Sequence, residues 1–341
     1  MSYCIWRRDL GVEKQQSPTA QDRIGPRPEH LHPVELNLGR QPVPNPAQSP
    51  FNIYITLHNH IKVYYREAGS RSSPTILLLH GFPSSSNQFR KLMPILAPKY
   101  HILAPDLPGF GFTEVPAELQ FKYSFENITS TIGSLLDALD ITRFVVYVFD
   151  YGAPTGFRLA LERPEAIVAV VSQNGNAYEE GLTPFWDPLR KLWAAPNSSE
   201  EEKNIRETIR NAVLTFAATK AQYLDGEPEA DVIDDPASYH LDWALMSRPG
   251  NAEIQLDLFK DYASNVALYP QFQAYLRKSQ VPLLAVWGKN DFFFAAQGAE
   301  AFKIDVMDAT VVLLDGGHFS SESHADEIGK LMLDFLQQRG I

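Results

Sequence analysis

An apolar run that stops abruptly at an acidic residue is the feature that most constrains this chain. Residues 144–149 are apolar and mostly β-branched or aromatic, which predicts a buried strand, and Asp-Tyr-Gly at 150–152 ends it. A helix-like run follows at 157–161, so the order is strand, tight turn and helix. This order exposes Asp150 at the carboxyl end of the strand. A carboxyl with a pKa near ~4 is ionised at pH 7, and it can attack an electrophilic saturated carbon to form an ester.

Strand and helix patterns alternate along most of the remaining chain, apart from one long interruption. Alternation at the start predicts two paired antiparallel strands, and the later apolar runs predict strands that are buried on both faces. The expected strands are 53–57, 61–67, 75–80, 101–106, 144–149, 166–172, 281–288 and 309–315, with helices at 124–139 and 328–337. The fold class is therefore α/β, with a mostly parallel central sheet and helices on both faces.

The interruption divides the chain into a core and an insertion. Residues 176–275 are helical, aromatic and irregular, and we expect them to form a helical cap over the strand ends, where open α/β sheets bind ligands. The α/β core then comprises 51–175 and 276–341. Residues 1–50 are rich in Pro, Gln, Arg and Asn and predict an irregular N-terminal extension. This extension is either a flexible tail or an arm on the main domain or on a second subunit.

Three residues capable of acid–base or nucleophilic chemistry follow three predicted strands. Asp150 comes first along the chain, Asp291 follows the strand at 281–288, and His318 follows the strand at 309–315. The carboxyl ends of parallel strands meet at one edge of a sheet, so these side chains are expected to converge. The order nucleophile, acid, histidine is that of a catalytic triad built on such a sheet.

Residues from about 50 to 341 resemble the α/β-hydrolase superfamily. Within it, the chain is similar to the branch with an Asp nucleophile, which contains epoxide hydrolases and haloalkane dehalogenases. The motifs that carry the resemblance are His80-Gly-Phe-Pro, Asp106-Leu-Pro-Gly-Phe-Gly, Val148-Phe-Asp-Tyr-Gly, Gly288-Lys-Asn-Asp and Gly316-Gly-His-Phe.

The resemblance implies a mechanism in two halves. Asp150 attacks the substrate carbon, and His318, oriented by Asp291, then activates the water that hydrolyses the resulting ester. The backbone N–H groups of Phe82 and Tyr151 are implied to form the oxyanion hole for the tetrahedral intermediate.

The leaving group separates the two reactions of this branch. An epoxide opens to an alkoxide, which needs a proton donor, and Tyr262 maps to a tyrosine that epoxide hydrolases carry on the cap. Ala263 follows it, where those enzymes often have Arg. Tyr178 and Tyr223 are candidates for a first cap tyrosine. Tyr178, Trp186 and Phe319 are the residues expected to line the substrate pocket.

A haloalkane or haloacid dehalogenase with the same Asp nucleophile remains the principal alternative. Haloalkane dehalogenases have Trp after the nucleophile and Asn or Trp after the His-Gly pair, whereas this chain has Tyr151 and Phe82. Neither supplies an indole or amide N–H for a halide, which favours the epoxide. Epoxide hydrolases also usually carry Trp after the nucleophile, so the reaction stays open at this point. A ligand-binding or biosynthetic protein of the same fold is the alternative from another class.

Charge and composition exclude several classes of binding partner and cofactor from the expectation. The formal net charge is −11 and no Lys/Arg-rich stripe stands out, which argues against a nucleic-acid partner. We see no apolar run long enough for a membrane span, no metal-ligand spacing and no nucleotide-binding glycine pattern. We expect a cofactor-independent hydrolase acting on a small apolar or amphipathic organic substrate. The lack of a signal-peptide pattern favours the cytoplasm, and a homodimer is left open.

Overall fold

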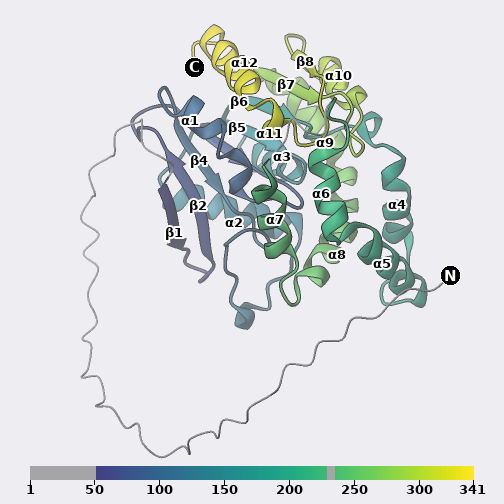
Figure 1. Ribbon diagram of the computed structural model, residues 1–341. Coiled ribbons are helices and arrows are strands. Elements are labelled where there is room, and N and C mark those ends of the chain that lie inside the picture. Colours follow the sequence, from purple (N-terminus) through teal and green to yellow (C-terminus); the bar gives the residue numbers. More distant parts are fainter. Residues whose placement is uncertain (1–50, 229–234) are drawn as a thin grey trace, which may run out of the picture. The chain divides into compact units, whose positions relative to one another are not determined.

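The computed structural model describes residues 51–228 and 235–341, so the predicted extension at 1–50 lies outside the described residues. The described part is built on an eight-stranded sheet with the order β1-β2-β4-β3-β5-β6-β7-β8 (Figure 1). Its strands are β1 (Phe51–Thr56), β2 (Lys62–Ala68), β3 (Thr75–Leu79), β4 (His101–Pro105), β5 (Phe144–Phe149), β6 (Ile167–Gln173), β7 (Leu283–Gly288) and β8 (Thr310–Leu314). β2 pairs antiparallel with both β1 and β4, and the remaining neighbours, in the order β4-β3-β5-β6-β7-β8, pair parallel. This mostly parallel sheet confirms the predicted fold class.

Helices connect these strands and cover both faces of the sheet. The α-helices are α1 (Leu92–Leu96), α2 (Phe125–Ala138), α3 (Gly152–Glu162), α4 (Asp187–Ala194), α5 (Glu200–Val213), α6 (Phe216–Leu224), α7 (Pro236–Met246), α8 (Asn251–Asp261), α9 (Ala263–Ser279), α10 (Ala296–Asp305), α11 (Ser320–Ser323) and α12 (Ala325–Gln338). Successive residues of β5 point to opposite faces. Val146 and Val148 join the core under α2 and α3, whereas Val145 and Tyr147 join the core under α1 and α12.

Two helices differ from the sequence expectation. α3 begins at Gly152, directly after the turn, and not at 157, because the tight turn leads straight into the helix. α10 lies between β7 and β8, where no helix was expected. Parallel neighbours need a crossover connection, and a helix is its usual form.

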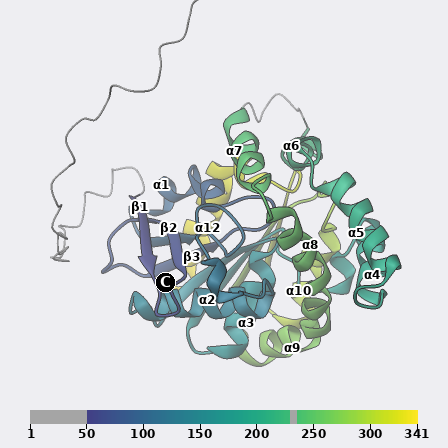
Figure 2. The same ribbon diagram turned by 90° about the horizontal axis from the view of Figure 1, so that it is seen from below.

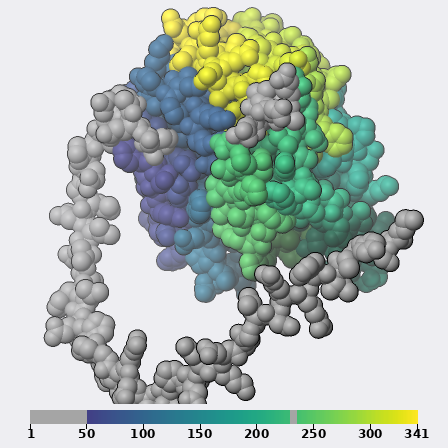
Figure 3. Space-filling view, in the orientation of Figure 1, coloured from purple at the N-terminus to yellow at the C-terminus, as the bar shows by residue number. Residues whose placement is uncertain are grey.

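The insertion between β6 and β7 contains α4 to α9. Figure 2 shows α4 to α8 grouped to one side of the sheet, while α9 lies beside α3. α9 therefore packs on the core, although it falls largely inside the range expected to be cap. Arg90 of the core links the insertion to the core. Its guanidinium donates to Asp235, the N-cap residue of α7, at 2.6 Å, and also to Glu322 of α11. In the space-filling view, the insertion (green) lies against the N-terminal part of the core (blue) and its C-terminal part (yellow) (Figure 3).

Candidate active site

The turn after β5 holds Asp150 in an uncommon backbone conformation. Its φ is +45°, in the left-handed region that costs a residue other than Gly about 1–3 kcal/mol. The turn is approached closely by the His-Gly-Phe-Pro segment that follows β3. A Cβ on Gly81 would lie 2.2 Å from Asp150 Oδ1 and 2.6 Å from the backbone nitrogen of Tyr151. Only glycine at position 81 lets the two turns come this close.

The carboxylate of Asp150 is held on one side and open on the other. The backbone N–H of Phe82 donates to Oδ1 at 2.6 Å, and the N–H of Tyr151 also favours the ionised carboxylate. Oδ2 lies 4.0 Å from His318 Nε2, too far for a direct hydrogen bond. Burial raises the pKa of Asp150 to about 6, against the lowering effect of His318 and the two N–H groups. The group is thus an anion at neutral pH, but only by a small margin.

His318 is oriented from its other nitrogen. Its Nδ1 lies 2.7 Å from Oδ2 of Asp291, and both side chains are buried. Burial lowers the pKa of His318, but the charge and hydrogen bond of Asp291 outweigh it, with a further contribution from the charge of Asp150. The net effect is a pKa above the ordinary value. The ring therefore presents Nε2 toward Asp150 with no protein group bridging the gap among the described residues.

Asn174, which sequence reasoning missed, fixes Asp291 in place. It follows directly after β6 with φ +48°. Its side-chain nitrogen donates to Oδ2 of Asp291 at 2.7 Å, and its side-chain oxygen accepts the backbone N–H of Gly288 at 2.8 Å. The sequence contained a signal for Asn174, because it follows a buried strand directly, and this is the same feature that identified Asp150.

Replacing Asn174 by Ala is expected to lower the free energy of unfolding by about 1–3 kcal/mol, because the buried groups it binds lose their partners. It is also expected to lower kcat, because Asp291 would no longer be held against His318. Denaturant unfolding and steady-state rates check this. Asp140→Ala is the matched control: Asp140 also has a positive φ, +57°, but it is exposed, so it isolates the backbone strain. Equal losses in both variants would contradict the assignment.

A small cavity lies over the side chains of Asp150 and His318. The space open to the centres of water-sized spheres is about 20 Å³, enough for roughly one water molecule. The lining residues are Phe82, Asp150, Tyr151, Phe185, Trp186, Val213, Gln222, Phe259, Phe293 and His318. The structure thus brings the predicted residues Phe82, Tyr151 and Trp186 to the same cavity as Asp150 and His318, and adds Gln222 from α6.

The predicted proton donor Tyr262 is buried but does not line this cavity. Its ring packs on two lining rings, with centroids 4.4 Å from Trp186 and 5.8 Å from Tyr151. Its hydroxyl lies 3.4 Å from that of Tyr269. Tyr262 is therefore one layer behind the wall of the cavity.

Three other predicted aromatic residues are placed away from the cavity. The Tyr178 hydroxyl donates to Oδ2 of Asp305 at 2.7 Å, so it serves the core near α10. Tyr223 binds the buried carboxyl of Asp242 and stacks on Phe319 with centroids 4.1 Å apart. Phe319 is fully buried behind His318. Each has a packing or hydrogen-bonding partner that the sequence pattern could not reveal.

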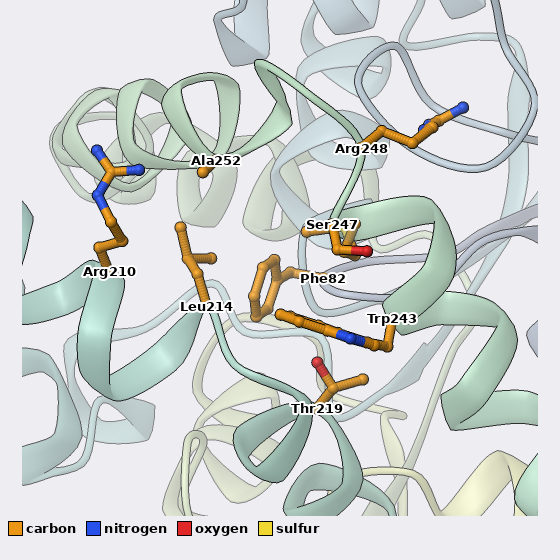
Figure 4. Close-up of a pocket in the computed structure, with 9 residues that line it drawn as sticks. Phe82, Arg210, Leu214, Thr219, Trp243, Ser247, Arg248 and Ala252 are labelled. Carbon is orange, nitrogen blue, oxygen red and sulfur yellow. The ribbon is translucent and has the colours of Figure 1, made fainter. Parts of the chain in front are cut away.

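A second and larger hollow opens among the insertion helices, and Phe82 lines both. Its volume on the same measure is about 250 Å³. Figure 4 shows the Phe82 ring between Leu214 and Trp243, with Thr219 below it. The remaining lining residues are Arg210, Met246, Ser247, Arg248 and Ala252. This outer pocket is mainly apolar near Phe82; Arg210 comes from the last turn of α5, and Arg248 comes from the segment that follows α7.

Among residues 51–228 and 235–341, no group of three or more His, Cys, Asp or Glu side chains is placed to hold a metal ion. No helix of these residues has the length and apolar character needed to cross a bilayer.

The fold and the arrangement of carboxylate, imidazole and second carboxylate at the strand ends are those of an α/β hydrolase. The family model of the alpha/beta hydrolase fold matches residues 74–325, so the chain belongs to that family. An uncharacterized hydrolase of Saccharomyces cerevisiae is 48% identical over 285 residues, covering 83% of this chain and 96% of the relative.

More distant relatives have named activities. Epoxide hydrolase 4 of Homo sapiens is 24% identical over 288 residues, covering 82% of this chain and 76% of the relative. The crystal structure of the haloalkane dehalogenase DbeA from Bradyrhizobium elkani has a TM-score of 0.67 at 21% identity, covering 85% of this chain and 98% of that chain. This structural likeness shows the fold, and the family and relatives together identify the chain as a hydrolase.

Proposed function

We propose that this hydrolase opens an epoxide to a diol through a covalent ester on Asp150. The observation that carries the proposal is the carboxylate at the turn after β5, with Oδ1 held by the backbone N–H of Phe82 and Oδ2 facing His318. A carboxylate in place of a hydroxyl makes attack at saturated carbon the favoured chemistry.

In the first half, Oδ2 of Asp150 attacks a ring carbon and the carbon–oxygen bond of the ring breaks. The N–H of Phe82 at 2.6 Å fixes Oδ1, so the attacking oxygen is aimed without a search over rotamers. The charge of Asp150 disappears as the ester forms.

In the second half, His318 Nε2 takes a proton from a water molecule, whose oxygen attacks the carboxyl carbon of Asp150. The N–H groups of Phe82 and Tyr151 then stabilise the oxyanion that develops on Oδ1. Because Asp150 no longer carries a charge, its contribution to the raised pKa of His318 is lost. The imidazole thus becomes easier to use as a neutral base at the step that needs one.

The indole groups near the cavity favour an epoxide over a halide. The indole N–H of Trp186 donates to the carbonyl of Phe293 at 2.9 Å, and that of Trp193 donates to the carbonyl of Phe259 at 2.8 Å. Both donors are therefore already engaged, and neither is left to hold a departing halide. The relatives include both epoxide hydrolases and haloalkane dehalogenases. The engaged indole N–H groups are the feature that favours the epoxide.

The two hollows suggest the form of the substrate. An apolar or amphipathic molecule would place its ring beside Asp150 and the rest of its skeleton in the outer pocket, past Phe82. We propose that such a substrate is met in the cytoplasm.

The test is to incubate the protein with a panel of aryl and alkyl epoxides and with bromoalkanes of matching length. Diol formation without bromide release is the expected result. Bromide release with no diol would replace the epoxide by a halide as the substrate. Tight binding with neither product would favour a ligand-binding role.

A further inference from the structure

A short segment of the insertion lies directly against the loop that carries His318. Residues 225–227 follow α6, and Oε1 of Glu227 accepts the backbone N–H of Gly317 at 2.9 Å. Gly317 immediately precedes His318 and is buried, so its N–H needs an acceptor within the protein. Among residues 51–228 and 235–341, Glu227 is the group that supplies one.

The same segment also contacts the loop that carries Asp291. The side-chain nitrogen of Asn290, the residue before Asp291, donates to the carbonyl of Gly226 at 2.8 Å. Gly226 has a φ of +87°, and a Cβ there would lie 2.7 Å from the carbonyl oxygen of Asn290 and 2.9 Å from Cα of Gly317. A residue with a side chain at this position would force the segment away from both loops.

α6 joins this contact to the two hollows. It carries Thr219, which lines the outer pocket, and Gln222, three residues further on, which lines the inner cavity. At the end of the helix the N–H of Asp225 donates to the carbonyl of Ala221 at 2.7 Å, so the segment 225–227 continues directly from the helix. One helix therefore borders both hollows and ends against the loops of the acid and the base.

The main chain around His318 is held from two sides. Gln173 of β6 donates to the carbonyl of His318 at 3.1 Å, and this contact lies within the core. Glu227, on the insertion, holds the preceding peptide. The position of the imidazole matters, because Nε2 lies 4.0 Å from Oδ2 of Asp150 and the proposed mechanism activates water beside this gap. A general base must stay within hydrogen-bond reach of the proton it takes, so a shift of this main chain would slow the step.

We propose that Glu227 is a positioning residue for the second half of the reaction, in which it holds Gly317 so that Nε2 of His318 faces the hydrolytic water. This inference rests on the proposed function and gives the insertion a part in placing the catalytic base. Glu227 acts as an acceptor and not through its charge. The charges that raise the pKa of His318 are those of Asp291 and Asp150.

The test changes the length and the charge of this side chain separately. Glu227→Gln keeps an acceptor oxygen at the same reach and removes the charge, whereas Glu227→Asp keeps the charge and withdraws the oxygen by one methylene. Glu227→Ala removes the acceptor, and Glu118→Ala, at an exposed position of the short helix Ala117–Leu119, is the control. Formation and decay of the ester on the Asp150 peptide are followed in a single turnover with styrene oxide, by quenching and mass spectrometry.

We expect Glu227→Ala to slow the decay of the ester by roughly 10–10²-fold, because a displaced base loses its alignment with the water. Glu227→Asp should slow decay by a smaller factor. Ester formation should stay within about threefold of the wild-type rate in both, because that step does not use His318. Glu227→Gln and Glu118→Ala should match the wild type in both steps. The pH at which decay reaches half of its maximal rate should be the same in Glu227→Ala as in the wild type.

A second pair of variants probes the same contact from the neighbouring residue. Gly226→Ala places a methyl group against Asn290 and Gly317, and it is expected to slow decay as Glu227→Ala does. Gly340→Ala is the matched control, since Gly340 also has a positive φ, +70°, but has open space around it. This pair and Glu227→Asp give the answer if Glu227→Ala does not fold.

Three results would overturn the inference. Equal slowing of ester formation and decay in Glu227→Ala would mean that the contact only supports the fold. Normal decay in Glu227→Asp with slow decay in Glu227→Gln would assign the effect to the charge. Unchanged decay in Glu227→Ala, with an ester that the wild type forms and consumes, would remove Glu227 from the mechanism and leave the proposed function intact. If the wild type forms neither ester nor diol from any epoxide, both fall.

Discussion

Asp150→Asn is expected to lower the rate of epoxide hydrolysis by roughly 10⁴–10⁶-fold, the loss typical of removing a nucleophile. The amide keeps the size of the side chain and can still accept the N–H of Phe82, so the turn is preserved. What it lacks is the negative charge that attacks carbon. Initial rates measured at pH 7 check this. Retention of more than about a tenth of the wild-type rate would show that bond formation does not depend on this carboxylate.

The same variant is expected to be more stable at pH 7, by about 1–3 kcal/mol. The reason is linkage: in the unfolded chain the carboxyl loses its proton near pH ~4, whereas burial raises the pKa in the folded chain to about 6. Between these values the folded state binds more protons, so stability falls as the pH rises. Unfolding curves at pH 4 and pH 7 should therefore converge at pH 4 and separate at pH 7. A wild type that is the more stable of the two at pH 7 would contradict the pKa assignment.

His318→Ala is expected to stop the reaction after ester formation, with a fall in steady-state turnover of roughly 10³-fold or more. Ester formation itself needs only the carboxylate and a donor to the leaving oxygen. Mass spectrometry of the variant, incubated with an epoxide that the wild type hydrolyses, should show an adduct on the peptide that contains Asp150.

The matched control is His324→Gln, because His324 lies six residues further along the same region, binds Ser323 and does not line the cavity. It should turn over normally and accumulate no adduct. An unmodified Asp150 peptide in His318→Ala, with a substrate that the wild type consumes, would rule out the covalent route.

The sequence was sufficient for the features that depend on strand ends. Asp150, Asp291 and His318 each follow a parallel strand (β5, β7 and β8), and parallel strands bring their carboxyl ends to one edge, so convergence could be predicted without coordinates.

The aromatic residues were harder to place, for a physical reason. A tyrosine in an aromatic insertion can turn its hydroxyl toward any of several neighbours, and sequence spacing does not say which. The hydroxyl of Tyr178 donates to Asp305 and that of Tyr223 to Asp242, whereas the hydroxyl of Tyr151 has no hydrogen-bond partner among the described residues. These outcomes depend on contacts between distant segments, whereas Asn174 sat at a strand end and could have been named.

Phe82 joins two tasks in one residue. Its ring separates the outer hollow from the space around Asp150, and its backbone N–H grips the carboxylate. The inner space is far too small for an organic skeleton, so every catalytic cycle requires the wall to yield and then reclose. If the main chain at 82 shifted during admission, the grip on Oδ1 would loosen with it. Admission must therefore proceed by swinging the ring or lifting the helices above it, and sluggish reclosure would make the turnover number sensitive to solvent viscosity.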